Sequence, residues 1–124
     1  MAITTTAAIF RKSGDTLDIT AAANIPAGAI KVIDGCNCLA QWPIANGETG
    51  VLKVLQRGEV VEVKTDDAIG ATNAGVPIYV IPATGLVTKS ADDGGTPTPT
   101  AYSLLGYTRA AVGASDLSFE VVCA

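Results

Sequence analysis

The stretch VLKVLQRGEVVEVK, residues 51–64, decides the fold class. Two apolar, β-branched runs, 51–55 and 60–64, flank a short connector that contains Gly58. Two runs of this kind around a glycine-containing connector predict a β-hairpin. A continuous helix would have to pass through Gly58, where glycine costs about 1 kcal/mol relative to alanine. The stretch therefore predicts strands and not a helix.

Working outward, further strands are predicted on both sides, over residues 15–20, 29–33, 36–42, 76–81, 85–89, 103–107 and 117–122. Residues 15–20 alternate strictly between apolar and polar, as a half-buried strand does. The dipeptide Asp34-Gly35 predicts a tight turn that pairs 29–33 with 36–42. Residues 103–107 and 117–122 are predicted to form the last strand pair.

Between these strands lie other local signals. Pro77 limits its strand to an edge or to a start at that residue. Residues 85–89 are a plausible return strand for 76–81. Thr65 is predicted to cap one short helical turn over 65–70. Residues 91–100, rich in Asp, Gly, Thr and Pro, are predicted to be a mobile surface loop.

Eight or nine short strands in a chain of 124 residues predict an all-β fold, a small β-sandwich or a β-barrel. The pattern does not choose between these two architectures. We expect one β domain over residues 14–124, preceded by an extended N-terminal arm over residues 1–13. The sequence shows no internal repeat of useful length.

The charge limits the partners. The chain has 8 basic and 12 acidic residues, for a net charge of −4. Nucleic-acid binders need a cationic surface to neutralise phosphates, so we expect no nucleic-acid partner. No apolar run approaches the length of about 20 residues that crosses a bilayer, so we expect no membrane partner.

The residues that carry enzyme chemistry are scarce. The chain has no histidine, which removes the commonest general base and metal ligand. The acidic pairs Asp66-Asp67 and Asp92-Asp93 lie in predicted loops and are interpreted as solvated surface charge. Cys36 and Cys38 are interpreted as small, buried or half-buried side chains on one strand face. We therefore expect no enzyme activity, no cofactor and no metal site.

Several segments, in order and spacing, resemble the DUF2190 family of phage capsid decoration, or cement, proteins. They are residues 14–20, 27–28, 46–51, 74–80 and 105–108. The resemblance covers about residues 14–122. It implies a non-enzymatic virion protein on the outer capsid surface of a tailed bacteriophage, bound to the major capsid protein. It also implies a homo-oligomer, with a homotrimer favoured and a dimer as the alternative.

Interface candidates come from apolar residues outside the strands. Ile3, Ile9 and Phe10 lie in the N-terminal arm, which either adds a strand to a neighbouring sheet edge or is a disordered terminus. Trp42, beside Pro43, is either an interface anchor or a core residue. The alternative function is a virion β-sandwich module for host adhesion or carbohydrate binding. A hydrolase with two carboxylates would require Asp66 or Asp92 in a deep pocket beside another acid.

Overall fold

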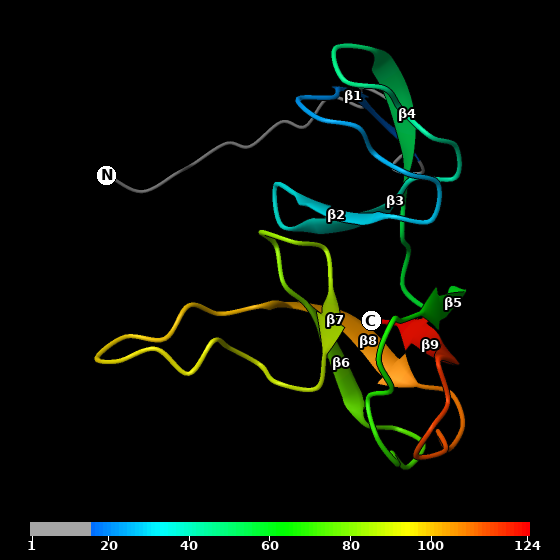
Figure 1. The fold of residues 1–124 in the computed structure, drawn as a ribbon, viewed down its shortest axis with the longest axis vertical. Helices are drawn as coiled ribbons and strands as arrows, with labels where there is room; N and C mark the ends of the chain where they lie inside the picture. Colours follow the sequence, from blue (N-terminus) through cyan, green and yellow to red (C-terminus); the bar gives the residue numbers. More distant parts are fainter. Residues whose placement is uncertain (1–15) are drawn as a thin grey trace, which may run out of the picture.

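The computed structural model describes residues 16–124, which form nine strands and no helix (Figure 1). The first sheet has the strand order β1 (Thr16–Thr20), β4 (Thr49–Val54), β3 (Cys36–Leu39), β2 (Ile30–Ile33). The second has the order β5 (Val60–Lys64), β9 (Ser118–Cys123), β8 (Ser103–Thr108), β6 (Pro77–Val80), β7 (Val87–Thr88). All pairs are antiparallel. The predicted all-β fold class is confirmed. The predicted arm, residues 1–13, lies outside the described residues.

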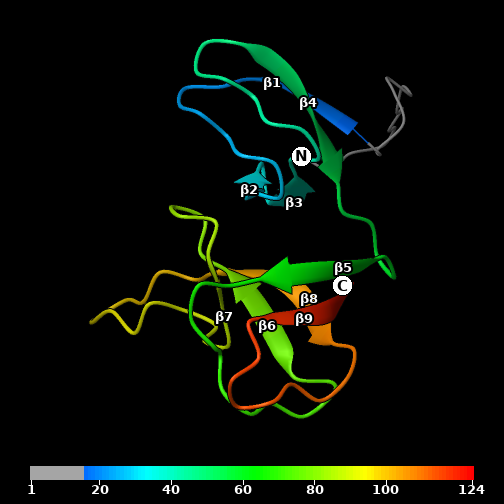
Figure 2. The same cartoon turned by 45° about the vertical axis from the view of Figure 1, so that its right-hand side comes forward.

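Each sheet has its own core. The first core is built from six buried residues, Ala21, Ile25, Cys38, Ala40, Ile44 and Leu52. The second and larger core contains Val63, Ile78, Val80, Leu105, Val112, Phe119, Val121 and Cys123, joined by Ile30 from the first sheet. Strands β2 and β3 lie between the rest of the first sheet and the second sheet in both views (Figures 1 and 2).

The two sheets repeat one topology. The first sheet has the order β1-β4-β3-β2, and the second has the matching order β5-β9-β8-β6, with the short β7 added at its edge. We call residues 16–54 the first unit and residues 60–123 the second unit. The second unit differs by a long insertion between β6 and β8, where the first unit has only the turn Asp34-Gly35. The repeat that the sequence did not show is therefore present in the structure.

The register repeats as well as the order. The pairs at the ends of the outer ladders are Thr16–Lys53 and Thr20–Thr49 in the first unit, and Val60–Val122 and Lys64–Ser118 in the second. The connecting loops also correspond. The isolated bridge Ile25–Ile44 matches the bridge Thr72–Val112, and the bond from Gly28 N to Ala40 O (2.6 Å) matches that from Gly75 N to Thr108 O (2.8 Å). Both glycines have positive φ, 87° and 80°.

The hairpin predicted over residues 51–64 is wrong, although both strands exist. Strand β4 belongs to the first sheet and β5 to the second, so the connector crosses between them. Its first residue, Leu55, still donates its N–H to Asn37 O (3.0 Å), and Gly58 N already donates to Cys123 O (2.8 Å). Lys53 and Glu59 form an ion pair across the connector (2.9 Å). Two apolar runs around a glycine do not show whether they pair with each other; here β4 pairs with β1 and β3, and β5 pairs with β9.

The predicted helical turn at residues 65–70 is also wrong. Thr65 N donates to Leu117 O (2.8 Å) and so continues the ladder between β5 and β9. The other local predictions are confirmed: β2 pairs with β3, β8 with β9, and β6 with β7. Pro77 is the first residue of β6, where proline requires no ladder N–H.

Residues 91–102 form a loop that projects from the body of the molecule, and we call it the projecting loop (Figure 1). Its predicted surface position is confirmed. It is closed at the base by a bridge between Asp92 and Ala101, and the Tyr102 N–H donates to Ala91 O (2.9 Å). Asp93 Oδ1 accepts the backbone N–H of Gly95 (2.8 Å) and of Thr100 (2.9 Å).

Candidate interaction surfaces

Trp42 lies in the loop between β3 and β4 with 75% of its surface exposed. The interpretation of Trp42 as a core residue is therefore wrong. The loop itself is held firmly, because Ile44 and Ile25 exchange two backbone hydrogen bonds of 2.8 Å each. A large aromatic side chain exposed on a well-anchored loop is available to a partner, since little conformational entropy remains to be lost on binding.

A shallow hollow adjoins this loop, and its lining is mostly apolar. The lining residues are Asn24, Ile25, Pro26, Pro43, Ile44, Ala45 and Glu48. Asn24 Oδ1 accepts the backbone N–H of Asn46 (2.8 Å) and ties the two walls together. We call Trp42 with these seven residues the Trp42 patch. The patch presents an aromatic side chain beside an apolar surface, which is an arrangement that suits a protein partner.

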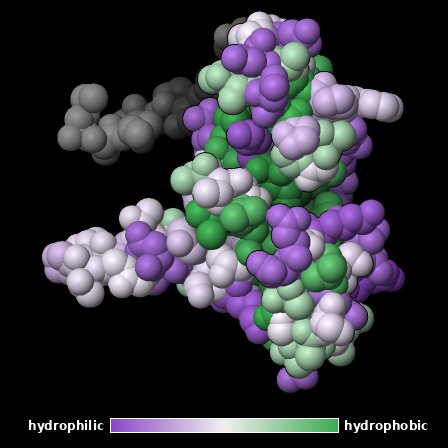
Figure 3. Space-filling view, viewed as in Figure 1, coloured by the Kyte–Doolittle hydropathy of each residue, from purple (hydrophilic) through white to green (hydrophobic). Residues whose placement is uncertain are grey.

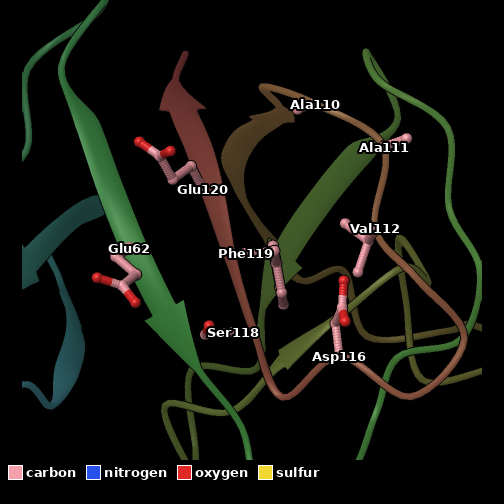
Figure 4. A pocket seen from close by; sticks show the side chains of 8 residues that line it. All are labelled: Glu62, Ala110, Ala111, Val112, Asp116, Ser118, Phe119 and Glu120. Atoms are coloured by element: carbon pink, nitrogen blue, oxygen red, sulfur yellow. The ribbon is translucent and has the colours of Figure 1, made fainter.

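A second hollow lies on the second unit and contains carboxylates (Figure 4). Glu62 and Glu120 face each other across β5 and β9, while Asp116 lies on the other side of Phe119. Glu120 accepts a hydrogen bond from Arg109 (3.0 Å), and Asp116 accepts the Gly113 N–H (2.8 Å). The three carboxylates point in different directions and do not converge on one point (Figure 4).

The loop acids of the sequence analysis line neither hollow. Asp66 is absent from both linings, and Asp92 Oδ1 accepts the Gly94 N–H (2.9 Å). The backbone N–H groups of Gly95 and Thr100 lower the pKa of Asp93. Within residues 16–124 no cluster of three or more potential ligands is placed to hold a metal ion. Asp92 and Asp93 therefore act locally, as turn-stabilising acceptors.

The cysteines differ in exposure. Cys38 is buried in the first core as predicted, but Cys36 is exposed because it follows the turn directly and lies beyond the covered part of the sheet. Cys123 is buried in the second core. Burial raises the pKa of both Cys38 and Cys123. The two buried thiols are therefore protonated, unreactive core residues at neutral pH.

A third surface was missed by the sequence analysis. Val60, Val122, Tyr107 and Pro77 are cross-strand neighbours in one row over β5, β9, β8 and β6. They face away from the second core, and Tyr79 lies on the same face. Tyr107 is 43% exposed and Val60 45%. The signal was present in the sequence, since these residues alternate with core residues, but alternation does not say which face is covered.

Of the predicted interface residues, only Trp42 can be placed. Ile3, Ile9 and Phe10 lie outside the described residues, so the structure brings them neither to Trp42 nor to another surface. Among residues 16–124 there is also no helix that is long and apolar enough to span a membrane.

The described residues form an all-β protein, and its candidate interaction surfaces are the Trp42 patch and the exposed row on the second sheet. The comparison with protein families gives the particular family. The chain matches the family model of phage cement proteins over residues 11–123 and belongs to that family. Comparison with curated proteins and with solved structures gave no match. Family membership makes it a structural, capsid-associated protein of a bacteriophage, and confirms the family expected from the sequence.

Proposed function

We propose that this chain is a decoration protein that binds the major capsid protein on the outer surface of a tailed-phage head and stabilises the assembled shell. The observation that carries the proposal is the family match over nearly the whole described chain. The surfaces support it, because the exposed apolar groups lie on rigid loops and sheet faces and the carboxylates do not converge. The proposed role is non-enzymatic and needs no cofactor.

The stabilisation follows from linkage. A protein that binds only the assembled, expanded shell lowers the free energy of that state by RT ln(1 + [L]/Kd) at each site. At a free concentration 100 times Kd this amounts to about 2.7 kcal/mol per site. Because a shell offers many sites, modest affinity at each resists the outward pressure of packaged DNA.

The Trp42 patch is our proposed anchor, for the capsid or for a neighbouring copy. It combines an exposed tryptophan with a mostly apolar hollow on loops held by backbone hydrogen bonds. Ile3, Ile9 and Phe10 are proposed as a second contact, through strand addition by residues 2–10. We also propose a homo-oligomer, with a trimer favoured over a dimer, and a single cooperative domain over residues 14–124.

The test is addition of the purified protein to expanded shells that lack it, followed by electron microscopy and by heating of the shells. We expect ordered density on the outer surface and a higher disruption temperature. Trp42→Ala should weaken binding at least about tenfold, as loss of an aromatic anchor does. Leu117→Ala is the matched control, because Leu117 is also apolar and 51% exposed but lies on the second unit. Absence of any binding to shells would refute the proposal.

A truncated chain without residues 2–10 tests the second contact. We expect it to fold normally, with the same circular dichroism, and to bind shells more weakly. Full binding by the truncated chain would contradict this role. A glycan array run in parallel tests the adhesion alternative. The exposed aromatic residues argue against it, because Trp42 lies on a loop of the first unit and Tyr107 on a strand of the second.

A further inference from the structure

The contact between the two units shows how one copy of the repeated fold packs on another. The first unit turns the outward face of β2 and β3, away from its own core, toward the second unit. Ile30, Val32 and Leu39 on that face pack into the second core. Asn37 lies on the same face. The contact thus joins the outward face of one unit to the open side of the other unit's core, and Figure 3 shows hydrophobic residues gathered where the two sheets meet.

The second unit has the same outward face, and it is apolar. The repeated register places Pro77, Tyr79 and Tyr107 at the positions of Ile30, Val32 and Leu39. Val122 and Val60 extend this face across the sheet. Among residues 16–124, none of these five residues of the second unit belongs to either core cluster. The face has the composition of a contact surface: Val60 and Tyr107 are exposed on it, while Pro77, Tyr79 and Val122 are half-buried.

The first unit, in turn, has a core with an open side. Ile19, Ile33 and Val54 are only partly buried. Their equivalents in the second unit are Val63, Val80 and Cys123, which are all buried. The positions match and the side chains are apolar in both units, so the difference in burial arises because the second core is covered by the first unit. The first core has no such cover among the described residues.

We infer that a second copy of this chain fills both vacant surfaces by docking head to tail: the outward face of the second unit of one copy packs on the open core side of the first unit of the next. The occupant follows from the repeat, because each chain already contains one contact of this kind. Such a heterologous contact closes into a ring or continues as a filament, depending on the rotation between copies.

Lys31 is expected to weaken this contact between copies. Lys31 lies on the open side of the first core, at the position where the second unit has the fully buried Ile78. Lys31 is exposed, and its aliphatic stem can lie along apolar surface while its ammonium group stays in water. The contact between copies is therefore weaker than the contact within the chain, and association depends on concentration.

The experiment is sedimentation velocity of the full chain over a wide range of concentration, without shells, so that its outcome is independent of capsid binding. Tyr107→Glu damages the outward face, and Ala29→Arg obstructs the open side of the first core, where Ala29 is half-buried. Each should raise the dissociation constant of self-association at least about tenfold. Val51→Glu is the matched control, because Val51 is 51% exposed on the outward face of β4 and outside the proposed contact.

Mixing the two damaged variants gives the decisive result. In a head-to-tail contact each variant keeps the surface that the other lacks, so the mixture should form dimers and nothing larger. Circular dichroism and the unfolding midpoint of each variant verify that it is folded. A monomeric wild type at every concentration would overturn the inference, and so would a mixture that fails to associate. Loss of association on deleting residues 2–10, with Tyr107→Glu without effect, would show that copies associate through the N-terminal segment instead and would also overturn the inference.

Discussion

Replacing Asn37 should loosen the contact between the two sheets. Its side chain bridges them with two hydrogen bonds: Nδ2 donates to Leu104 O (2.8 Å), and Oδ1 accepts from Ser103 Oγ (2.9 Å). A hydrogen bond contributes about 1 kcal/mol net, and a polar group left without its partner adds to the loss. Because the site is only part-buried, we expect Asn37→Ala to lower the free energy of unfolding by about 1–3 kcal/mol.

Urea titration measures the free energy of unfolding, and differential scanning calorimetry measures Tm. For a domain of this size about 1 kcal/mol shifts Tm by about 3–5 °C, so a loss of about 1–3 kcal/mol should lower the Tm of Asn37→Ala by roughly 3–15 °C. Asn37→Asp keeps the acceptor for Ser103 but loses the donor to Leu104, and should be equally or more destabilising. Thr20→Val is the control, because it removes a hydrogen bond to Thr49 (3.1 Å) that is exposed and lies within one sheet. A change below about 0.5 kcal/mol in Asn37→Ala, or two separate unfolding transitions in the wild type, would refute the reasoning.

Three further outcomes are expected. Gly106→Ala should lower the free energy of unfolding by more than about 2 kcal/mol in urea titrations, because a Cβ there would collide with the carbonyl oxygen of Val122, which is backbone and cannot turn aside. Cys36 should react with a thiol reagent in the folded protein, while Cys38 should react only after unfolding, as measured by labelling and mass spectrometry. Backbone N–H donors lower the pKa of Asp93 below its ordinary value of 3.8. The hydrogen bonds to the Asp93 carboxylate therefore stabilise the projecting loop fully above that ordinary pKa, and this stabilisation is lost as the pH falls through the lower pKa of the folded state. Amide NMR signals of the loop should shift only in that acidic range.

The sequence was sufficient for the strands but not for their partners. The period of two and the turn residues placed eight of the nine strands within about two residues of their observed bounds, with β3 the exception in extending too far. Those signals are local, since each depends on one residue and its immediate neighbours. Pairing between β4 and β1, or β5 and β9, is decided by contacts across many residues, and the runs at 51–55 and 60–64 look alike whether or not they pair.

The candidate site was predictable only in part. The sequence left Trp42 open as either an interface anchor or a core residue, and its 75% exposure excludes only the core residue. The row formed by Val60, Tyr107 and Val122 was not recognised, because each lies on a different strand and only the sheet register brings them together. A surface assembled across strands leaves no contiguous signal in the chain.

The sequence does not reveal the repeat, because equivalent positions of the two units carry different residue types. Equivalent positions share backbone pairing, but they do not share surroundings. Leu39 lies against the second core while Tyr107, its equivalent, is half exposed. Asn37, which pairs with Val32, bonds across the sheets, whereas the residue paired with the equivalent Tyr79 is the apolar Leu104. The surroundings of a position determine which side chain packs well there, whereas the register depends on backbone hydrogen bonds. The two units could therefore diverge in residue type without losing their topology. The insertion at residues 81–102 also leaves the topology unchanged, because it lies at a hairpin turn, which tolerates added length more readily than a paired strand does.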